Sequence, residues 1–386
     1  MDLVNQRRRT GALLYVISSA LSGVAPVNRL PADSIYSLAT KHSLGALASY
    51  GMELSGASPE SAVSDRMQAI RRAMLFDSAR AEILARFEEA GIQYICLKGV
   101  IIKDMYPAIG LREMSDNDIL INYDDRRRAR TIMCELGYTF DSYGKGHHDA
   151  YIKEPIYNFE IHIALFSYKN ETFSKYFADV MERATPVGKC ERVMSEEDFY
   201  LFMKAHEYKH YASGGTGLRS LVDTYVYMKE KASALDLEFV ERECEKLGIS
   251  AYERDVRALS MKLFDPAFAD MLLAYARDGA ELPLSDEEWD MLDYISTSGT
   301  YGNASRQIDN AMKEYGEKGK GGKLRFVLDS LFPPMGYYME NAPLVYKFKI
   351  LIPFYRLYRI VYVIFSNHKY VFGQLKNLIK YKKNKK

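Results

Sequence analysis

Residues 115–121 of this 386-residue chain read SDNDILI, and this short segment decides how the rest of the sequence is interpreted. Two of its residues, Asp116 and Asp118, are separated by a single position. Because successive side chains of a β-strand point to opposite faces, both aspartates should share one face. The isoleucines that follow can then pack against a core. We therefore predict a strand with one acidic and one apolar face.

A second strand of the same kind is predicted at residues 157–165, YNFEIHIAL, where Glu160 and His162 share a face. If the two strands are neighbours, Asp116, Asp118 and Glu160 converge. Two carboxylates about 4 Å apart repel each other by roughly 4 kcal/mol at an effective dielectric constant of 20. We expect this repulsion to destabilise the metal-free protein. Oxygen ligands on rigid strands suit Mg²⁺ or Mn²⁺, and such sites serve two-metal phosphoryl or nucleotidyl transfer.

Candidate phosphate-binding residues precede the acidic strand. In the segment CLKGV, Lys98 and Gly99 follow a short β-prone run. Glycine lets a backbone approach a phosphate closely, and lysine supplies a positive charge. Arg112, in the GLR turn, could add a bidentate contact to a polyphosphate. Each signal is weak alone, and their order along the chain is the stronger indication.

The periodicity of apolar residues predicts an α+β chain with three regions. Residues 1–76 form an N-terminal helical region, residues 77–194 a small α/β core, and residues 195–386 a C-terminal helical region with a basic tail.

The chain resembles the uncharacterised nucleotidyltransferase family of the DNA polymerase β-like superfamily. The resemblance runs from about Ala90 to Lys231 and rests on LKGVIIKDMYP, GLREMSDNDILI, ELGY, FEIHI and KHYASGGTGLRSLVDTYVYM. It implies a small mixed β-sheet nucleotidyltransferase core, two divalent metals, and transfer of a nucleoside monophosphate with release of pyrophosphate. It does not identify the acceptor. Where the superfamily usually has Gly-Ser or Gly-Gly, this chain has Gly99 and Val100, a difference that Lys98 can offset.

The resemblance also implies roles for the candidate residues. Asp116 and Asp118 would bridge two Mg²⁺ or Mn²⁺ ions, and Glu160 would complete the metal site and help to remove the proton of the acceptor hydroxyl. Lys98, Gly99 and Arg112 would hold the nucleoside triphosphate. The acceptor, which could be a small molecule, sugar, peptide or protein, would bind between the helical flanks.

Two other functions remain open. A non-catalytic binding protein could use the same fold. A zinc hydrolase could use the segment HEYKH, because His206, Glu207 and His210 match the H-E-x-x-H pattern on a helix. The histidines lie on the helix face expected to be buried, so we favour a packing or hydrogen-bonding role for them.

Other polar residues near these motifs have a structural and a functional interpretation. Arg219 and Asp223, four residues apart on one helix, are expected to form a structural ion pair. His147 and His148 could line the acceptor side of the cleft, although a surface loop is the default interpretation.

Composition restricts the partners. Lys and Arg (52) nearly balance Asp and Glu (51), and we find no basic stripe interleaved with aromatic residues, which disfavours a polynucleotide acceptor. The four cysteines are widely spaced, which fits a reducing cytoplasm. We expect no transmembrane segment, because charged residues and a proline interrupt the most apolar run. The tail from Ser366 to Lys386 holds seven lysines and no acid; it could contact an anionic surface, although a solvated tail is the simpler interpretation.

Overall fold

A five-stranded sheet forms around the acidic strand. The computed structural model describes residues 3–26, 30–144, 146–300, 310, 332–333 and 335–366. The strands are β1 (Tyr94–Cys96), β2 (Asn117–Ile121), β3 (Thr139–Ser142), β4 (His148–Lys153) and β5 (Tyr157–His162). Their order is β1-β2-β5-β4-β3, with β2 and β5 parallel and the other neighbours antiparallel. The sheet is therefore mixed, and the predicted α+β class is confirmed.

One face of the sheet is apolar and covered by helices. Ile119 and Ile121 of β2, together with Phe159 and Ile161 of β5, belong to one buried cluster. The long helix α4 (Glu60–Ala90) and the helix α6 (Arg126–Glu135) contribute buried side chains to the same cluster. Alternation along the strands then leaves Asp118 and Leu120 to face the other way, where Asp118 lines a cavity and Leu120 joins the large apolar core of the helices.

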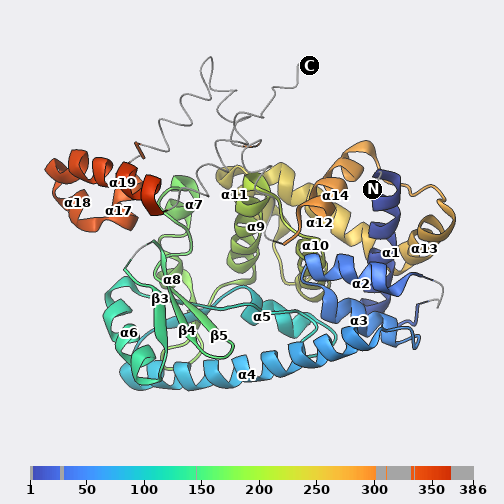
Figure 1. Ribbon diagram of the computed structural model, residues 1–386, viewed down its shortest axis with the longest axis horizontal. Coiled ribbons are helices and arrows are strands. Elements are labelled where there is room, and N and C mark those ends of the chain that lie inside the picture. Colours follow the sequence, from blue (N-terminus) through green and yellow to red (C-terminus); the bar gives the residue numbers. More distant parts are fainter. Residues whose placement is uncertain are drawn as a thin grey trace, which may run out of the picture.

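Helices make up most of the remaining chain (Figure 1). Before the sheet lie α1 (Leu3–Ser22), α2 (Ala32–Lys41) and α3 (Gly45–Glu53). Around and after it lie α5 (Gly99–Ile102), α7 (Glu171–Tyr176), α8 (Val180–Arg183), α9 (Glu196–Ser213), α10 (Arg219–Lys231), α11 (Leu237–Leu247), α12 (Ser250–Leu263), α13 (Ala269–Asp278) and α14 (Asp286–Ser298). A two-stranded ribbon pairs β6 (Thr185–Pro186) with β7 (Arg192–Val193). The first helices and helices α9 to α14 share one large apolar core.

Helix α4 runs along the lower edge of the molecule (Figure 1). One end lies below the sheet and the other below the N-terminal helices. Phe76, near its middle, packs on Phe159 with ring centroids 6.2 Å apart. The predicted boundary between residues 76 and 77 falls inside this helix. The predicted boundary at residues 194–195 coincides with the start of α9, where the Ser195 side chain accepts a hydrogen bond from the Asp198 amide.

The last described elements are α17 (Met335–Asn341), α18 (Pro343–Lys347) and α19 (Ile352–Ser366), which project from the upper left of the body in Figure 1. They and the turn before α19 expose several large apolar side chains, including Ile350 of the turn and Phe354 and Leu357 of α19. Among the described helices, none combines the length and apolar character that a membrane span requires. Apart from Ser366, the basic tail lies outside the described residues.

Candidate active site

The sheet brings the predicted acids together. In the parallel pair of β2 and β5, Asp118 lies opposite Glu160 and Leu120 lies opposite His162. Asp118 therefore shares a face with Glu160 and, two residues further along β5, with His162. Asp116 lies one residue before β2, close enough for its charge to act on Asp118 and Glu160.

Asp118 is neutralised within the protein. Its carboxylate is buried, and Oδ1 accepts hydrogen bonds from Lys98 Nζ and from His162 Nε2, each at 2.8 Å. Burial raises the pKa of Asp118, but the Lys98 ammonium and the hydrogen bond from His162 outweigh it, so the net pKa lies below the ordinary value. We expected repulsion among the carboxylates to dominate in the metal-free site. For Asp118 this expectation is wrong, because Lys98 and His162 compensate its charge.

Repulsion between the carboxylates affects Asp116 instead. Burial and the neighbouring charge of Asp118 raise the pKa of Asp116, and Lys98 offsets this only in part. Burial also raises the pKa of Glu160, but a contact from His162 Nε2 at 3.4 Å helps to bring the net pKa below its usual value. Of the three acids, Asp116 is thus the one whose negative charge the metal-free protein leaves uncompensated.

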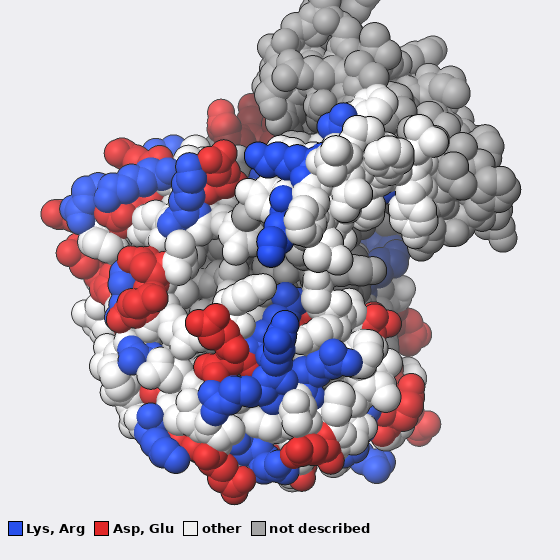
Figure 2. All heavy atoms as spheres, turned by 90° about the vertical axis from the view of Figure 1, so that its left-hand side faces the viewer, with Lys and Arg blue, Asp and Glu red and all other residues white. Residues whose placement is uncertain are grey.

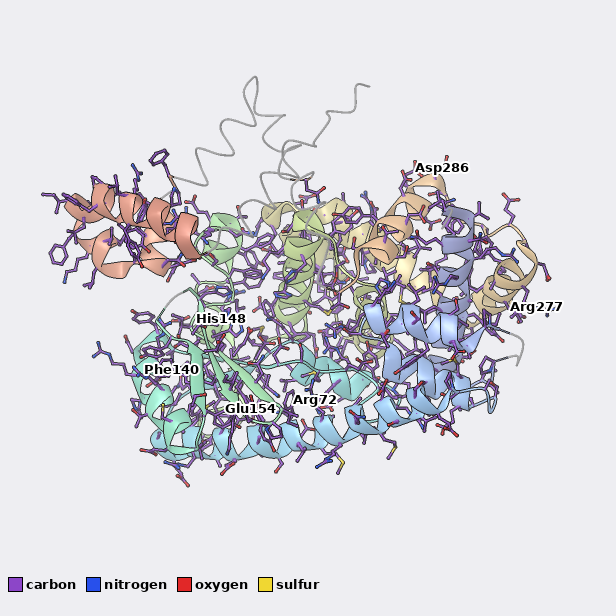
Figure 3. The ribbon with its side chains drawn as sticks, in the orientation of Figure 1. Arg72, Phe140, His148, Glu154, Arg277 and Asp286 are labelled. Carbon is purple, nitrogen blue, oxygen red and sulfur yellow. The ribbon has the colours of Figure 1, made fainter. Side chains whose placement is uncertain are left out.

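These side chains form the floor of a cavity of about 370 Å³. Helices α9 and α10 supply the facing wall, with Lys209, His210 and Arg219 among its lining residues. In Figure 3, His148 marks the end of the sheet nearest α9, whereas Glu154 marks the opposite end, near α4. The cavity thus combines the carboxylates of the sheet with the basic side chains of Lys98, Lys209 and Arg219, which suits a polyphosphate bound with cations.

A family described as uncharacterised nucleotidyltransferases matches the chain over residues 28–265. The chain belongs to this family. No curated protein and no solved structure matches the sequence. The match includes both acidic strands, the Lys98 turn, and helices α9 and α10.

Nucleotidyltransferases generally use divalent metals, and the donor atoms of this family member fit one. Among the described residues, ligand atoms of Asp118, Glu160 and His162 lie within 4.8 Å of one another.

Lys98 has an unusual backbone conformation in the turn between β1 and α5. Its φ of 48° and ψ of −118° lie in a region that favours glycine. The backbone is fixed there because Ile102 N donates to Lys98 O and Leu97 N donates to Asp118 O. Gly99, by contrast, has no positive φ; a Cβ at this position would overlap the Arg112 guanidinium and the Met114 sulfur.

This conformation gives a prediction. Lys98→Gly and Lys98→Ala both remove the ion pair to Asp118, but only alanine keeps the backbone strain. We expect the glycine variant to be more stable than the alanine variant by about 1–2 kcal/mol. Urea unfolding of both proteins measures the difference, and an alanine variant of equal or greater stability would contradict it. Both variants should weaken nucleoside triphosphate binding equally, by about 1.5–3 kcal/mol.

Arg112 lies at the cavity wall with most of its guanidinium already engaged. Its Nε and Nη2 donate to the two oxygens of Asp223, both at 2.9 Å, and Tyr106 Oη donates to Asp223 Oδ1 at 2.7 Å. Asp223 thus pairs with Arg112 rather than with Arg219, whose Nη1 donates to the Glu113 carbonyl. The predicted ion pair within α10 is wrong, because a bidentate partner from another element satisfies Asp223.

The HEYKH segment lies on α9, with its histidines toward the cavity. The rings of His206 and His210 are 4.7 Å apart, and burial lowers the pKa of both. Glu207 is buried and accepts a hydrogen bond from Lys204 Nζ at 2.7 Å. A zinc hydrolase would need this glutamate free to act as a base, so its pairing with Lys204 favours a structural role.

The sequence patterns assign no functional role to two residues of the cavity, His162 and Lys209. His162 was placed on the acidic face of its strand but given no role, although its spacing from Glu160 indicates that they act together. Lys209 lies inside the HEYKH segment but is not one of the residues that form the zinc-binding pattern. Burial and the charge of Lys98 lower its pKa to about 8. Among the residues that the structure describes, no carboxylate forms an ion pair with it.

Proposed function

We infer that the protein is a divalent-cation-dependent nucleotidyltransferase that moves a nucleoside monophosphate from a nucleoside triphosphate to an acceptor hydroxyl and releases pyrophosphate. The observation that carries this proposal is the parallel register of Asp118 with Glu160, with Asp116 beside them, at the floor of a cavity whose opposite wall contains Lys209 and Arg219. Membership of the nucleotidyltransferase family supports the same reaction class.

The carboxylates suit Mg²⁺ or Mn²⁺. Asp116 carries a charge that the protein leaves uncompensated, as its raised pKa indicates, and a cation would compensate it. Asp116, Asp118 and Glu160 would hold the metal as oxygen ligands. When bound, it would offset the negative charge that develops on the triphosphate during transfer.

The protein side chains then have distinct tasks. Glu160, whose lowered pKa keeps it ionised at neutral pH, accepts the proton of the acceptor hydroxyl. The acceptor oxygen bonds to the α-phosphorus, and the bond from that phosphorus to the bridging oxygen of the β-phosphate breaks. The electron pair of the broken bond leaves with pyrophosphate. Lys98 and Lys209 hold the phosphates from opposite sides of the cavity, and Arg112 supports the wall between them.

The acceptor is proposed to be a small molecule, sugar, peptide or protein. On the face shown in Figure 2, the described Lys and Arg side chains are interspersed with Asp and Glu, unlike the continuous basic track that a polynucleotide needs. We propose a cytoplasmic location because the four cysteines are free thiols, as a reducing compartment would keep them.

A transfer assay tests the proposal. The protein is incubated with each α-³²P-labelled nucleoside triphosphate, Mg²⁺ and a cell extract, and labelled products are separated from free nucleotide. We expect a new labelled product and an equal amount of pyrophosphate with at least one triphosphate. Tight triphosphate binding without product, under conditions that cover all four bases, would instead support a binding protein on the same fold.

The pKa of Lys209 gives a pH prediction. An ammonium binds phosphate only while protonated, so triphosphate affinity should be highest below pH 8 and fall above it. The charged groups that act on Lys209 are Lys98, Glu160 and Asp118. Between pH 7.5 and 9.5 we expect affinity to fall about tenfold or more, the scale of one charge-assisted hydrogen bond.

Lys209→Arg supplies the matched control for this experiment, because arginine stays charged throughout the range. Calorimetric titration with triphosphate and Mg²⁺ should give a nearly flat profile for Lys209→Arg and a uniformly weak one for Lys209→Met. A wild-type decline that persists in Lys209→Arg would assign the titration to another group.

A further inference from the structure

Five of the seven histidines in the chain line the cavity, and three of them gather on the sheet. His147 and His148 stand at the start of β4, and His162 ends the neighbouring strand β5, where it pairs with His148. Their ring centroids are 4.8 Å apart for His147 and His148, 5.1 Å for His148 and His162, and 5.7 Å for His147 and His162. One potential ligand atom from each lies within 4.8 Å of the others.

His147 and His148 are prepared to donate lone pairs, whereas the hydrogen bonds of His162 to Asp118 and Glu160 outweigh its burial and raise its pKa, so a metal at this ring would displace a proton. Burial, reinforced by the neighbouring histidines, lowers the pKa of His147 to about 3, and burial also lowers the pKa of His148. Both rings are therefore neutral at physiological pH. Neutral imidazole is the ligand that Zn²⁺ and related transition metals prefer, whereas Mg²⁺ prefers oxygen.

Two ring nitrogens at this place have no hydrogen-bond partner among the described residues. They are Nδ1 of His148 and Nδ1 of His162, and both are buried. A buried polar atom without a partner is costly and calls for a ligand. On His162, Nε2 is already hydrogen-bonded to the Asp118 carboxylate, which leaves Nδ1 for another contact. Metal-binding histidines commonly have this arrangement, with one nitrogen on a carboxylate and the other on the metal.

We propose that His147, His148 and His162 form a binding site for Zn²⁺ or a similar imidazole-preferring divalent cation, which shares His162 with the neighbouring group of Asp118 and Glu160. Three nitrogens at about 3.3 Å from one another complete three corners of a tetrahedral zinc site. The ligand atoms lie within 4.8 Å of one another, and the rings would move closer on binding the metal. The fourth corner remains for water or a bound anion in the cavity.

The site would also regulate transfer, a step that rests on the proposed function. His162 contacts both Asp118 and Glu160, so a dication held by this ring places positive charge beside the carboxylates. We expect Zn²⁺ to weaken the binding of Mg²⁺ at those carboxylates by electrostatic repulsion between the two cations. Zinc would then act as an inhibitor of the enzyme.

The test is calorimetric titration of the full chain with Zn²⁺ in buffer that contains excess Mg²⁺. We expect one Zn²⁺ per chain, and about a hundredfold weaker binding for His147→Gln combined with His148→Gln. The matched control is His206→Gln combined with His210→Gln, which removes the other close histidine pair of the same cavity. The control should bind Zn²⁺ within about twofold of the unaltered protein.

The outcomes separate the possible sites. Unchanged Zn²⁺ affinity in the His147 and His148 variant would overturn the proposal in favour of the carboxylates, and loss in the control variant would move the metal to the HEYKH helix. If the His147 and His148 variant does not fold, the visible spectrum of the Co²⁺-loaded unaltered protein tests whether the metal has nitrogen ligands. Intense absorption indicates a four-coordinate nitrogen site, and weak absorption of a six-coordinate oxygen site contradicts it. Neither readout depends on catalytic transfer, so the zinc site and the proposed function can fail independently.

Discussion

Asp116→Asn should stabilise the metal-free protein and Asp118→Asn should destabilise it, although either change should reduce transfer by at least about a thousandfold. The two aspartates are two residues apart and were predicted to be equivalent ligands. Their surroundings give the two aspartates opposite effects on the stability of the metal-free protein. Asp118 accepts from Lys98 and His162, whereas Asp116 carries an uncompensated charge. Replacing Asp118 should cost about 2 kcal/mol, the scale of a hydrogen bond to a charged group.

The stability that each aspartate contributes depends on pH with opposite signs. The lowered pKa of Asp118 contributes stability that is present above its unfolded value of about 3.9 and lost as pH falls through the folded pKa. The raised pKa of Asp116 contributes stability that is present below its unfolded value and lost as pH rises through the folded pKa. The advantage of Asp116→Asn over the unaltered protein should therefore be larger at pH 7 than at pH 4.

Thermal unfolding without metal at these two pH values, followed by unfolding with Mg²⁺ and triphosphate, measures these effects. With ligand present, the unaltered protein should become the most stable of the three, because binding stabilises the native state in proportion to affinity. If Asp116→Asn destabilises the metal-free protein as much as Asp118→Asn does, Asp116 has a structural role, through its hydrogen bond with Ser115 and the charge of Lys98. If either variant keeps full metal-dependent stabilisation, the carboxylates do not hold the metal.

Arg112→Met should destabilise the protein by about 3–5 kcal/mol, because it leaves the buried carboxylate of Asp223 without its bidentate partner. Combining it with Asp223→Asn removes the uncompensated charge and should recover about half of the loss, while the amide still accepts from Tyr106. Urea unfolding of the single and double variants checks both values.

The same variants decide what Arg112 does. If its main role were to bind phosphate, Arg112→Met would fold normally and lose only triphosphate affinity. The geometry favours a supporting role, since two of its three nitrogens are committed to Asp223 and the third lies 3.2 Å from the Met114 sulfur. A stable Arg112→Met protein that binds triphosphate weakly would return Arg112 to the phosphate-binding residues.

The convergence of the acids could be predicted because it depends on local rules. Period-two alternation assigns Asp118 and Glu160 to one face of each strand, and parallel neighbours then bring them together. The position of Lys98 at a strand end also follows from local pattern. These features need no knowledge of distant contacts.

The partners of these residues could not be predicted in the same way. The pairing of Arg112 with Asp223 joins positions 111 residues apart, and no local spacing reveals it. The i,i+4 spacing suggested Arg219 for Asp223, and tertiary packing overrode that weak preference. Likewise, repulsion among the acids was predicted from their charges alone, without the Lys98 and His162 contacts that neutralise Asp118.

Helix α4 determines where this protein can be divided. A fragment that begins at residue 77 would start in mid-helix and lose Phe76, whose ring covers Phe159 on the back of the catalytic sheet. It would also lose Ile70, which lies against the left-handed Gly110 in the turn before the acidic strand. The sheet and the whole of helix α4 should therefore be expressed, exchanged and evolved as one piece, and a protease should cut in the loop at residues 54–59 rather than near residue 77.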